Sequence, residues 1–117
     1  MLTGCAGQSN YKANTYRQIT MDEALTMIAE EHGYIILDVR RPDEYAAGHS
    51  PNAINVPNET RGTDDIPELP DKDQLIMVYC RSGRRSKEAS EKLVKLGYTN
   101  IVEFGGILDW NGEIVTD

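Results

Sequence analysis

The sequence predicts an α/β fold in which helices cover both faces of a mostly parallel sheet. Residues 34–39 and 74–79 are near-continuous apolar runs, as is typical of strands buried on both faces of a parallel sheet. Stretches with apolar residues at helical spacing precede the first run and follow the second. Because strands that alternate with helices need crossover connections, we expect a parallel sheet between two helical layers.

Capping residues define the elements expected in the first half of the chain. Thr20 is typical of an N-cap, and Glu23 three positions later completes a capping box ahead of a helical pattern. Pro42 suits the first turn of a second, short helix, which Gly48 closes. The expected elements are a helix ended by Gly33, a strand at 34–39, a helix at 42–47 and a strand at 53–56.

The second half of the chain begins with its least regular stretch. Residues 58–73 are polar and contain Pro67 and Pro70, so we expect a surface excursion with one weak helical turn. The strand that follows ends at Cys80. The remaining expected elements are a helix at 87–96 capped by Gly97, a strand at 101–104, and a short final helix that follows Gly105-Gly106 and carries Trp110.

Length, charge and cysteine content limit the function. The chain has 117 residues, which suits a single domain, and we place the folded domain at 15–117. Its 12 basic and 19 acidic residues give a net charge of −7, so we expect no nucleic-acid partner. Cys5 and Cys80 lie far apart and only two histidines could join them, so we expect no disulfide scaffold, no metal and no cofactor. We also expect a monomer.

Residues 1–14 have neither helical nor strand periodicity, and we expect a flexible tail. Within it, residues 2–5 (LTGC) resemble a bacterial lipobox, the short signal whose cysteine is acylated. The resemblance implies that Cys5 is lipidated and that a lipid anchor holds the domain at a membrane, outside the cytoplasm. The alternative is a chance tetrapeptide in the tail of a cytoplasmic protein.

Residues 80–87 contain the strongest chemical signal in the sequence. Four of the 12 basic residues fall in this segment. It leads from a buried strand into a helix, so its backbone N–H groups and the helix N-terminus can converge on a bound anion. Gly83 permits a tight turn, and Ser86 is a candidate cap for the helix. The candidate anion-binding residues are Arg81, Ser82, Gly83, Arg84, Arg85 and Ser86.

Cys80 lies where the buried strand ends and the arginines begin, which favours a reactive cysteine over an inert core residue. The positive charges nearby favour the thiolate, which is the nucleophilic form. No general base is adjacent in sequence, and His49 lies 31 positions upstream, so we expect activation by electrostatics rather than by a cysteine–histidine pair. This interpretation requires a sulfur that is open to solvent and amides that face it.

Three segments, taken in order, resemble the rhodanese family of sulfurtransferases, over a region from about Tyr16 to the C-terminus. Residues 37–57 (LDVRRPDEYAAGHSPNAINVP) resemble the amino-terminal signature of the family, although SPN at 50–52 departs from its usual apolar-Pro-Gly turn. Residues 80–86 (CRSGRRS) are similar to its active-site loop, and residues 105–110 (GGILDW) to its carboxy-terminal signature.

The resemblance implies a three-layer sandwich around a parallel five-stranded sheet, and a cysteine that alternates between thiolate and persulfide. Cys80 would take the outer sulfur of thiosulfate or a related anionic donor, release sulfite, and pass the sulfur to cyanide or a thiol. Amides of residues 81–86 would hold the persulfide, and the arginine side chains would bind the donor. Asp38 and Arg40 would support the fold rather than react.

Three other functions remain open at this point. Phosphatases and arsenate reductases of the same family need an arginine after five intervening residues, and that position is Ser86. A binding or sensing module without turnover would commonly lack the cysteine that this chain retains. A thiol redox protein would need a second thiol, and Cys5 lies in the tail.

Overall fold

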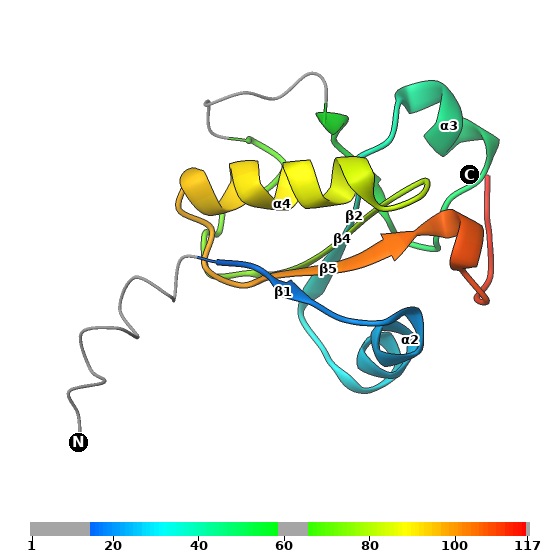
Figure 1. The fold of residues 1–117 in the computed structure, drawn as a ribbon, viewed down its shortest axis with the longest axis horizontal. Helices are drawn as coiled ribbons and strands as arrows, with labels where there is room; N and C mark the ends of the chain where they lie inside the picture. The colour runs from blue at the N-terminus through cyan, green and yellow to red at the C-terminus, as the bar shows by residue number, and fades with distance from the viewer. Residues whose placement is uncertain (1–14, 59–65, 117) are drawn as a thin grey trace.

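The computed structural model describes residues 15–58 and 66–116. One sheet of five strands forms the centre of the fold, with the order β1-β5-β4-β2-β3 and parallel pairing throughout (Figure 1). The strands are β1 (Arg17–Gln18), β2 (Tyr34–Asp38), β3 (Ile54–Asn55), β4 (Leu75–Cys80) and β5 (Ile101–Gly106). The predicted α/β fold with a parallel five-stranded sheet is therefore confirmed.

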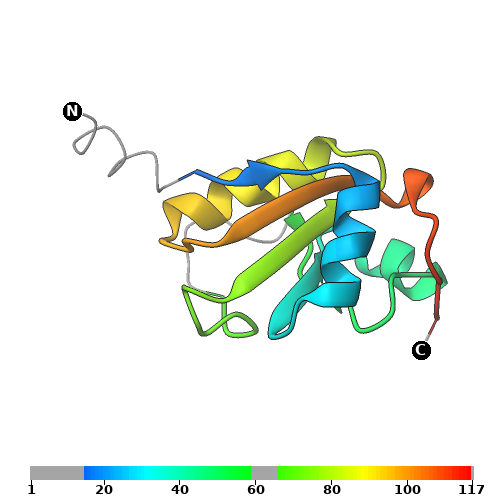
Figure 2. The same ribbon diagram turned by 90° about the horizontal axis from the view of Figure 1, so that it is seen from below.

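Helices cover the two faces of this sheet, as the alternation of elements predicts. Helix α4 (Arg84–Lys95) lies on one face, and α2 (Met21–Glu30) lies on the other (Figure 1; Figure 2 shows the sheet from below). The short helix α3 (Pro42–Ala47) and the 3-10 helix η2 (Ile107–Asp109) lie beyond the carboxyl ends of the strands. The predicted capping box of α2 is present, since Thr20 and Glu23 exchange both of its hydrogen bonds.

Alternating residues of the buried strands supply two hydrophobic cores. Leu37 and Val78 belong to the core that also contains Ala89 and Leu93 of α4. Their chain neighbours Ile36 and Met77 belong to the second core, with Ala24 of α2 and Phe104. A strand buried on both faces needs apolar residues at every position, because successive side chains point to opposite sides. This requirement explains the continuous apolar runs in the sequence.

Two local predictions were wrong, and one short strand was not predicted. Helix α4 begins at Arg84 rather than Lys87, because Gly83 acts as its N-cap in a left-handed conformation with φ of +115°. The edge strand β1 was not predicted, since two residues show no periodicity. The stretch before β4 is not wholly a surface excursion: Ile66 and Leu69 are buried in the α4-side core.

The predicted tail at 1–14, with the candidate lipidation site Cys5, lies outside the described residues. Part of the predicted excursion, residues 59–65, also lies outside them. Within 15–58 and 66–116, none of the helices has both the length and the apolar character needed to cross a bilayer.

Candidate functional site

Cys80 is the last residue of β4, the central strand of the sheet. It is therefore fixed between β2 and β5, at the carboxyl edge where ligands of parallel α/β folds collect. Cys80 pairs with Gly106 of β5 after an irregularity in the register. The backbone of Arg81 and Ser82 then packs directly on Gly106, whose missing side chain leaves the space for this contact. The segment from Cys80 to Ser86, here called the cysteine loop, leads into α4.

The cysteine loop directs one backbone donor and one hydroxyl at the sulfur. The Gly83 N–H donates to Cys80 Sγ at 2.9 Å, and the Ser86 hydroxyl oxygen lies 3.5 Å from the sulfur. The expectation that a loop amide faces the sulfur is met at Gly83. The expectation of an open thiol is not met, because Cys80 is only 1% exposed. The loop folds over the sulfur, so a donor reaches it only if the loop shifts.

Ser86 has a different place from the one the sequence suggested. It does not cap the helix, because it is the third residue of α4, and its side chain is fully buried. Its hydroxyl lies 2.9 Å from the Gly83 carbonyl oxygen and 2.5 Å from Oε2 of Glu103. Glu103 lies on β5 and is 2% exposed. Sequence inspection missed this carboxyl group because it lies 17 positions from Ser86.

A polar pocket of about 440 Å³ lies over the outer side of the cysteine loop. Its lining residues are Arg41, Glu44, Arg81, Ser82, Arg84 and Arg85. The pocket combines basic side chains with the N-terminal end of α4, an arrangement suited to an anion. Arg41 was not among the predicted anion-binding residues. Its contribution arises from the turn into α3, which places it beside the loop.

The loop arginines differ in their ion pairs and in their exposure to solvent. Arg85 donates to both carboxylate oxygens of Glu44, at 2.7 and 3.1 Å, with side chains only 12% and 14% exposed. This hydrogen bonding lowers the pKa of Glu44 to about 2. Arg84 forms an exposed ion pair with Glu88. Arg81 is exposed, and it has no ion pair within the part of the chain that the structure describes.

Asp38 and Arg40 form a buried ion pair next to the loop. Asp38 accepts from the Arg40 guanidinium at 2.7 Å and from the Tyr79 hydroxyl at 2.7 Å, and Arg40 also donates to the Gly48 carbonyl oxygen. Burial, reinforced by the Asp38 carboxylate, raises the pKa of Tyr79, so its phenol remains a hydrogen-bond donor. These contacts join β2, β4 and the segment after α3, and none of them reaches Cys80. The geometry is that of a structural brace.

The fold and the cysteine loop define a class of α/β proteins that hold a cysteine beneath an arginine-rich loop at the carboxyl end of a parallel sheet. Among the described residues, no group of three or more histidine, cysteine, aspartate or glutamate side chains is placed to hold a metal ion. Residues 20–113 match the rhodanese-like domain family, and the chain belongs to that family.

The chain is similar in sequence to two sulfurtransferases and in structure to two solved rhodanese proteins. Thiosulfate sulfurtransferase PspE of Escherichia coli is 37% identical over 86 residues, which cover 74% of this chain and 80% of that protein. A chloroplastic thiosulfate sulfurtransferase of Arabidopsis thaliana is 36% identical over 67% of this chain and 74% of its own length. The crystal structure of a rhodanese-related protein from Thermoplasma volcanium has a TM-score of 0.72 and 30% identity, and covers 87% of this chain and 100% of that one. A rhodanese with anions from Escherichia coli has a TM-score of 0.65 at 35% identity, and covers 72% and 99%.

Proposed function

We propose that the protein transfers sulfane sulfur from thiosulfate or a similar anionic donor to cyanide or a thiol, through a persulfide on Cys80. Membership of the rhodanese-like family supports sulfur transfer as the kind of chemistry. Two relatives named thiosulfate sulfurtransferases support thiosulfate as the donor. The observation that carries the proposal is the 2.9 Å hydrogen bond from the Gly83 amide to the Cys80 sulfur, at the entrance to α4.

Two displacements at sulfur make up the proposed cycle. In the first, the Cys80 thiolate attacks the outer sulfur of thiosulfate. A sulfur–sulfur bond forms to Cys80, the bond within thiosulfate breaks, and its electron pair leaves on sulfite. In the second, cyanide or a thiolate attacks the outer persulfide sulfur, the bond to Cys80 breaks, and the thiolate is regenerated. Each step conserves charge and needs no external oxidant or reductant.

The groups of the site have distinct parts in this cycle. The Gly83 N–H and the first turn of α4 place positive partial charge at the sulfur, which favours its anionic form before and after loading. The polar pocket over the outer side of the cysteine loop, called the outer pocket from here on, receives the sulfonate end of the donor. Arg81, which forms no ion pair among the described residues, binds it there. The resemblance to a rhodanese with anions supports an anionic ligand in this pocket.

The burial of Cys80 makes loop movement part of the proposed mechanism. The donor occupies the outer pocket, and Arg81 and Ser82 shift to admit its outer sulfur to Cys80. Enclosure of the sulfur also protects a persulfide from competing thiols, since a persulfide exposed to solvent exchanges readily.

Mass spectrometry of the full chain after incubation with thiosulfate tests the proposal. The expected product is a protein heavier by one sulfur atom, which disappears after addition of cyanide with the formation of thiocyanate. The Cys80→Ala variant should take up no sulfur, whereas Cys5→Ser should load normally. An unchanged mass of the folded wild-type protein under these conditions would reject thiosulfate as donor, and loading of Cys80→Ala would reject Cys80 as the carrier.

A further inference from the structure

Glu103 is a buried acidic side chain next to the cysteine loop that the sulfur-transfer cycle does not use. It lies on β5, is 2% exposed, and in the described part of the chain no lysine or arginine forms an ion pair with it. Its Oε2 accepts from the Gly105 N–H at 2.9 Å and contacts the Ser86 hydroxyl. Glu103 Oε2 is therefore a buried acceptor atom that lies against the Ser86 hydroxyl.

The Ser86 hydroxyl connects Glu103 to the reactive sulfur. It lies 2.5 Å from Glu103 Oε2 and 3.5 Å from Cys80 Sγ. A serine hydroxyl has one proton to donate and lone pairs that accept. The sulfur, the hydroxyl and the carboxyl group therefore form a chain whose hydrogen bonds can run in either direction, from thiol to carboxylate or from carboxylic acid to thiolate.

We propose that Glu103 is the proton acceptor for the Cys80 thiol, acting through Ser86. The S–H bond of Cys80 breaks, its electron pair stays on sulfur, and its proton bonds to the Ser86 oxygen. The original hydroxyl proton of Ser86 passes to Glu103 Oε2. Two protons each move by one bond, the net transfer is of one proton from Cys80 to Glu103, and the products are a Cys80 thiolate and a neutral Glu103 acid. The Ser86 hydroxyl then donates to the thiolate.

Both ends of the chain favour this direction of transfer. At one end, the Gly83 N–H and the N-terminus of α4 stabilise negative charge on sulfur. At the other, Glu103 Oε2 lies within hydrogen-bond reach of the Ser86 hydroxyl, close enough to take its proton. A protonated Glu103 also places no second negative charge beside the thiolate or the persulfide. The chain thus supplies the general base that is absent from the sequence around Cys80, and its role in turnover rests on the proposed sulfur transfer.

Glu103→Gln separates proton transfer from structural support. The amide oxygen of glutamine still accepts from the Gly105 N–H, so the local hydrogen bond at β5 is kept. The same oxygen cannot donate to Ser86, whereas a carboxylic acid can accept from Gly105 and donate to Ser86 at one atom. The Ser86 hydroxyl then stays directed at the glutamine and no longer donates to a thiolate.

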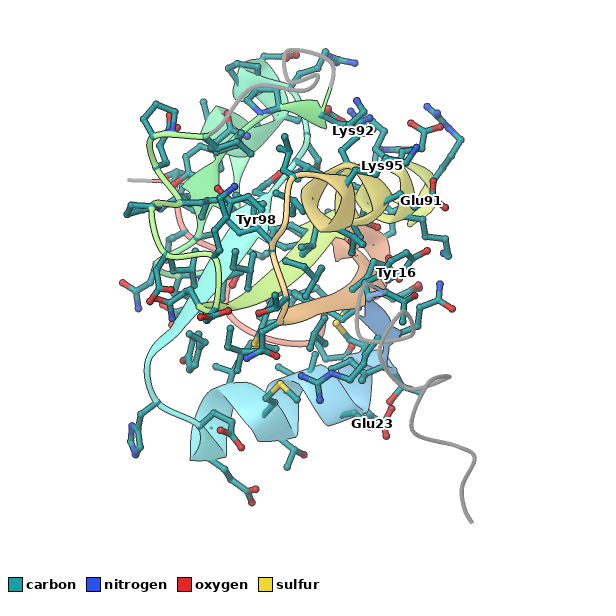
Figure 3. The ribbon with its side chains drawn as sticks, turned by 90° about the vertical axis from the view of Figure 1, so that its left-hand side faces the viewer. Tyr16, Glu23, Glu91, Lys92, Lys95 and Tyr98 are labelled. Atoms are coloured by element: carbon teal, nitrogen blue, oxygen red, sulfur yellow. The ribbon has the colours of Figure 1, made fainter. Side chains whose placement is uncertain are left out.

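The matched control is Glu91→Gln, which changes the same functional group on the outward side of α4 (Figure 3). Glu91 is exposed and makes no contact with the sulfur chain. Ser86→Ala removes the connecting hydroxyl and tests whether Glu103 acts through it. All variants are made in the full chain with Cys5→Ser, so that Cys80 is the sole thiol.

Two readouts at neutral pH follow the proton and need no sulfur donor. In the infrared spectrum, the wild type should show the carbonyl band of a buried carboxylic acid and no S–H stretching band. Glu103→Gln should lose the carbonyl band of the carboxylic acid and gain the S–H stretching band. Alkylation of Cys80 by iodoacetamide should slow roughly tenfold in Glu103→Gln, the effect of losing one hydrogen bond to a charged group, and remain unchanged in Glu91→Gln. The double variant Ser86→Ala with Glu103→Gln should be alkylated no more slowly than Ser86→Ala alone.

Opposite results would overturn the proposal. An S–H band in the wild type at neutral pH would show that the proton remains on Cys80. Faster alkylation of Glu103→Gln would identify Glu103 as an ionised neighbour that repels the thiolate, and an unchanged rate with an unchanged spectrum would leave it a purely structural role. Because these readouts do not use thiosulfate, failure of persulfide formation would reject the proposed function without affecting this result.

Discussion

Gly106→Ala tests whether the position of the cysteine loop depends on its contact with β5. A methyl group at this position would lie 2.1 Å from the carbonyl oxygen of Arg81 and 2.6 Å from the Cα atom of Ser82. Both contacts are with backbone atoms, so no side-chain rotation relieves them. The backbone of Gly106 itself is extended, and the expected effect is therefore purely steric.

The size of the clash sets the expected effect. An acceptable contact requires the loop and β5 to separate by about 1 Å, and overpacking of this kind costs about 3 kcal/mol. For a domain of this length, that loss lowers the melting temperature by roughly 10 °C. A displacement of about 1 Å at a reacting group reduces rates on the order of 100-fold, so sulfur loading of Cys80 should fall by that factor.

Gly105→Ala is the matched control for this prediction. Gly105 has φ of +98°, so alanine there is strained by about 1 to 2 kcal/mol, but the space around its missing side chain is open. Thermal unfolding and the rate of sulfite release from thiosulfate are measured for both variants. A Gly106→Ala variant that is as stable as Gly105→Ala and releases sulfite at the wild-type rate would show that the loop does not depend on this contact.

Two further predictions concern the ion pairs around the loop. The Arg85 guanidinium lowers the pKa of Glu44 from 4.5 to about 2, so the folded state should lose stability as pH falls from about 4.5 towards 2. Acid unfolding of Glu44→Gln should lack this loss of stability. Identical acid unfolding curves for the variant and the wild type would contradict the prediction. Arg40→Met leaves the buried Asp38 carboxylate without its cation and should lower the free energy of unfolding in urea by about 3 to 5 kcal/mol. A loss under about 1 kcal/mol is typical of a surface ion pair and would contradict this prediction.

The central elements could be predicted from the sequence because each has a local physical signal. Burial on both faces imposes the apolar runs of β2 and β4, and the Thr20 capping box marks the start of α2. The start of α4 was placed too late, since a left-handed Gly83 can cap a helix without any side-chain hydrogen bond. Strand β1 has two residues and acquires its structure only by pairing with β5.

The candidate site was predictable where its residues are contiguous. Cys80 and its loop form one segment of sequence, so their chemistry could be recognised before their geometry. Glu44 and Glu103 reach the loop from α3 and β5, and the sequence does not show that either carboxyl group lies near Cys80. The burial of Cys80 depends on how the loop closes over it, which residue types alone do not determine.

The central position of β4 has a consequence for motion around the sulfur. Pairing holds this strand to β2 as far as Tyr79 and to β5 as far as Cys80. Its amide hydrogens should therefore exchange with deuterated solvent only when the whole sheet opens, whereas those of Arg81 and Ser82 exchange through local fluctuations. The sulfur therefore lies at the boundary between a segment that exchanges slowly and one that exchanges fast. The strand holds Cys80 in place, and only movement of the loop exposes its sulfur.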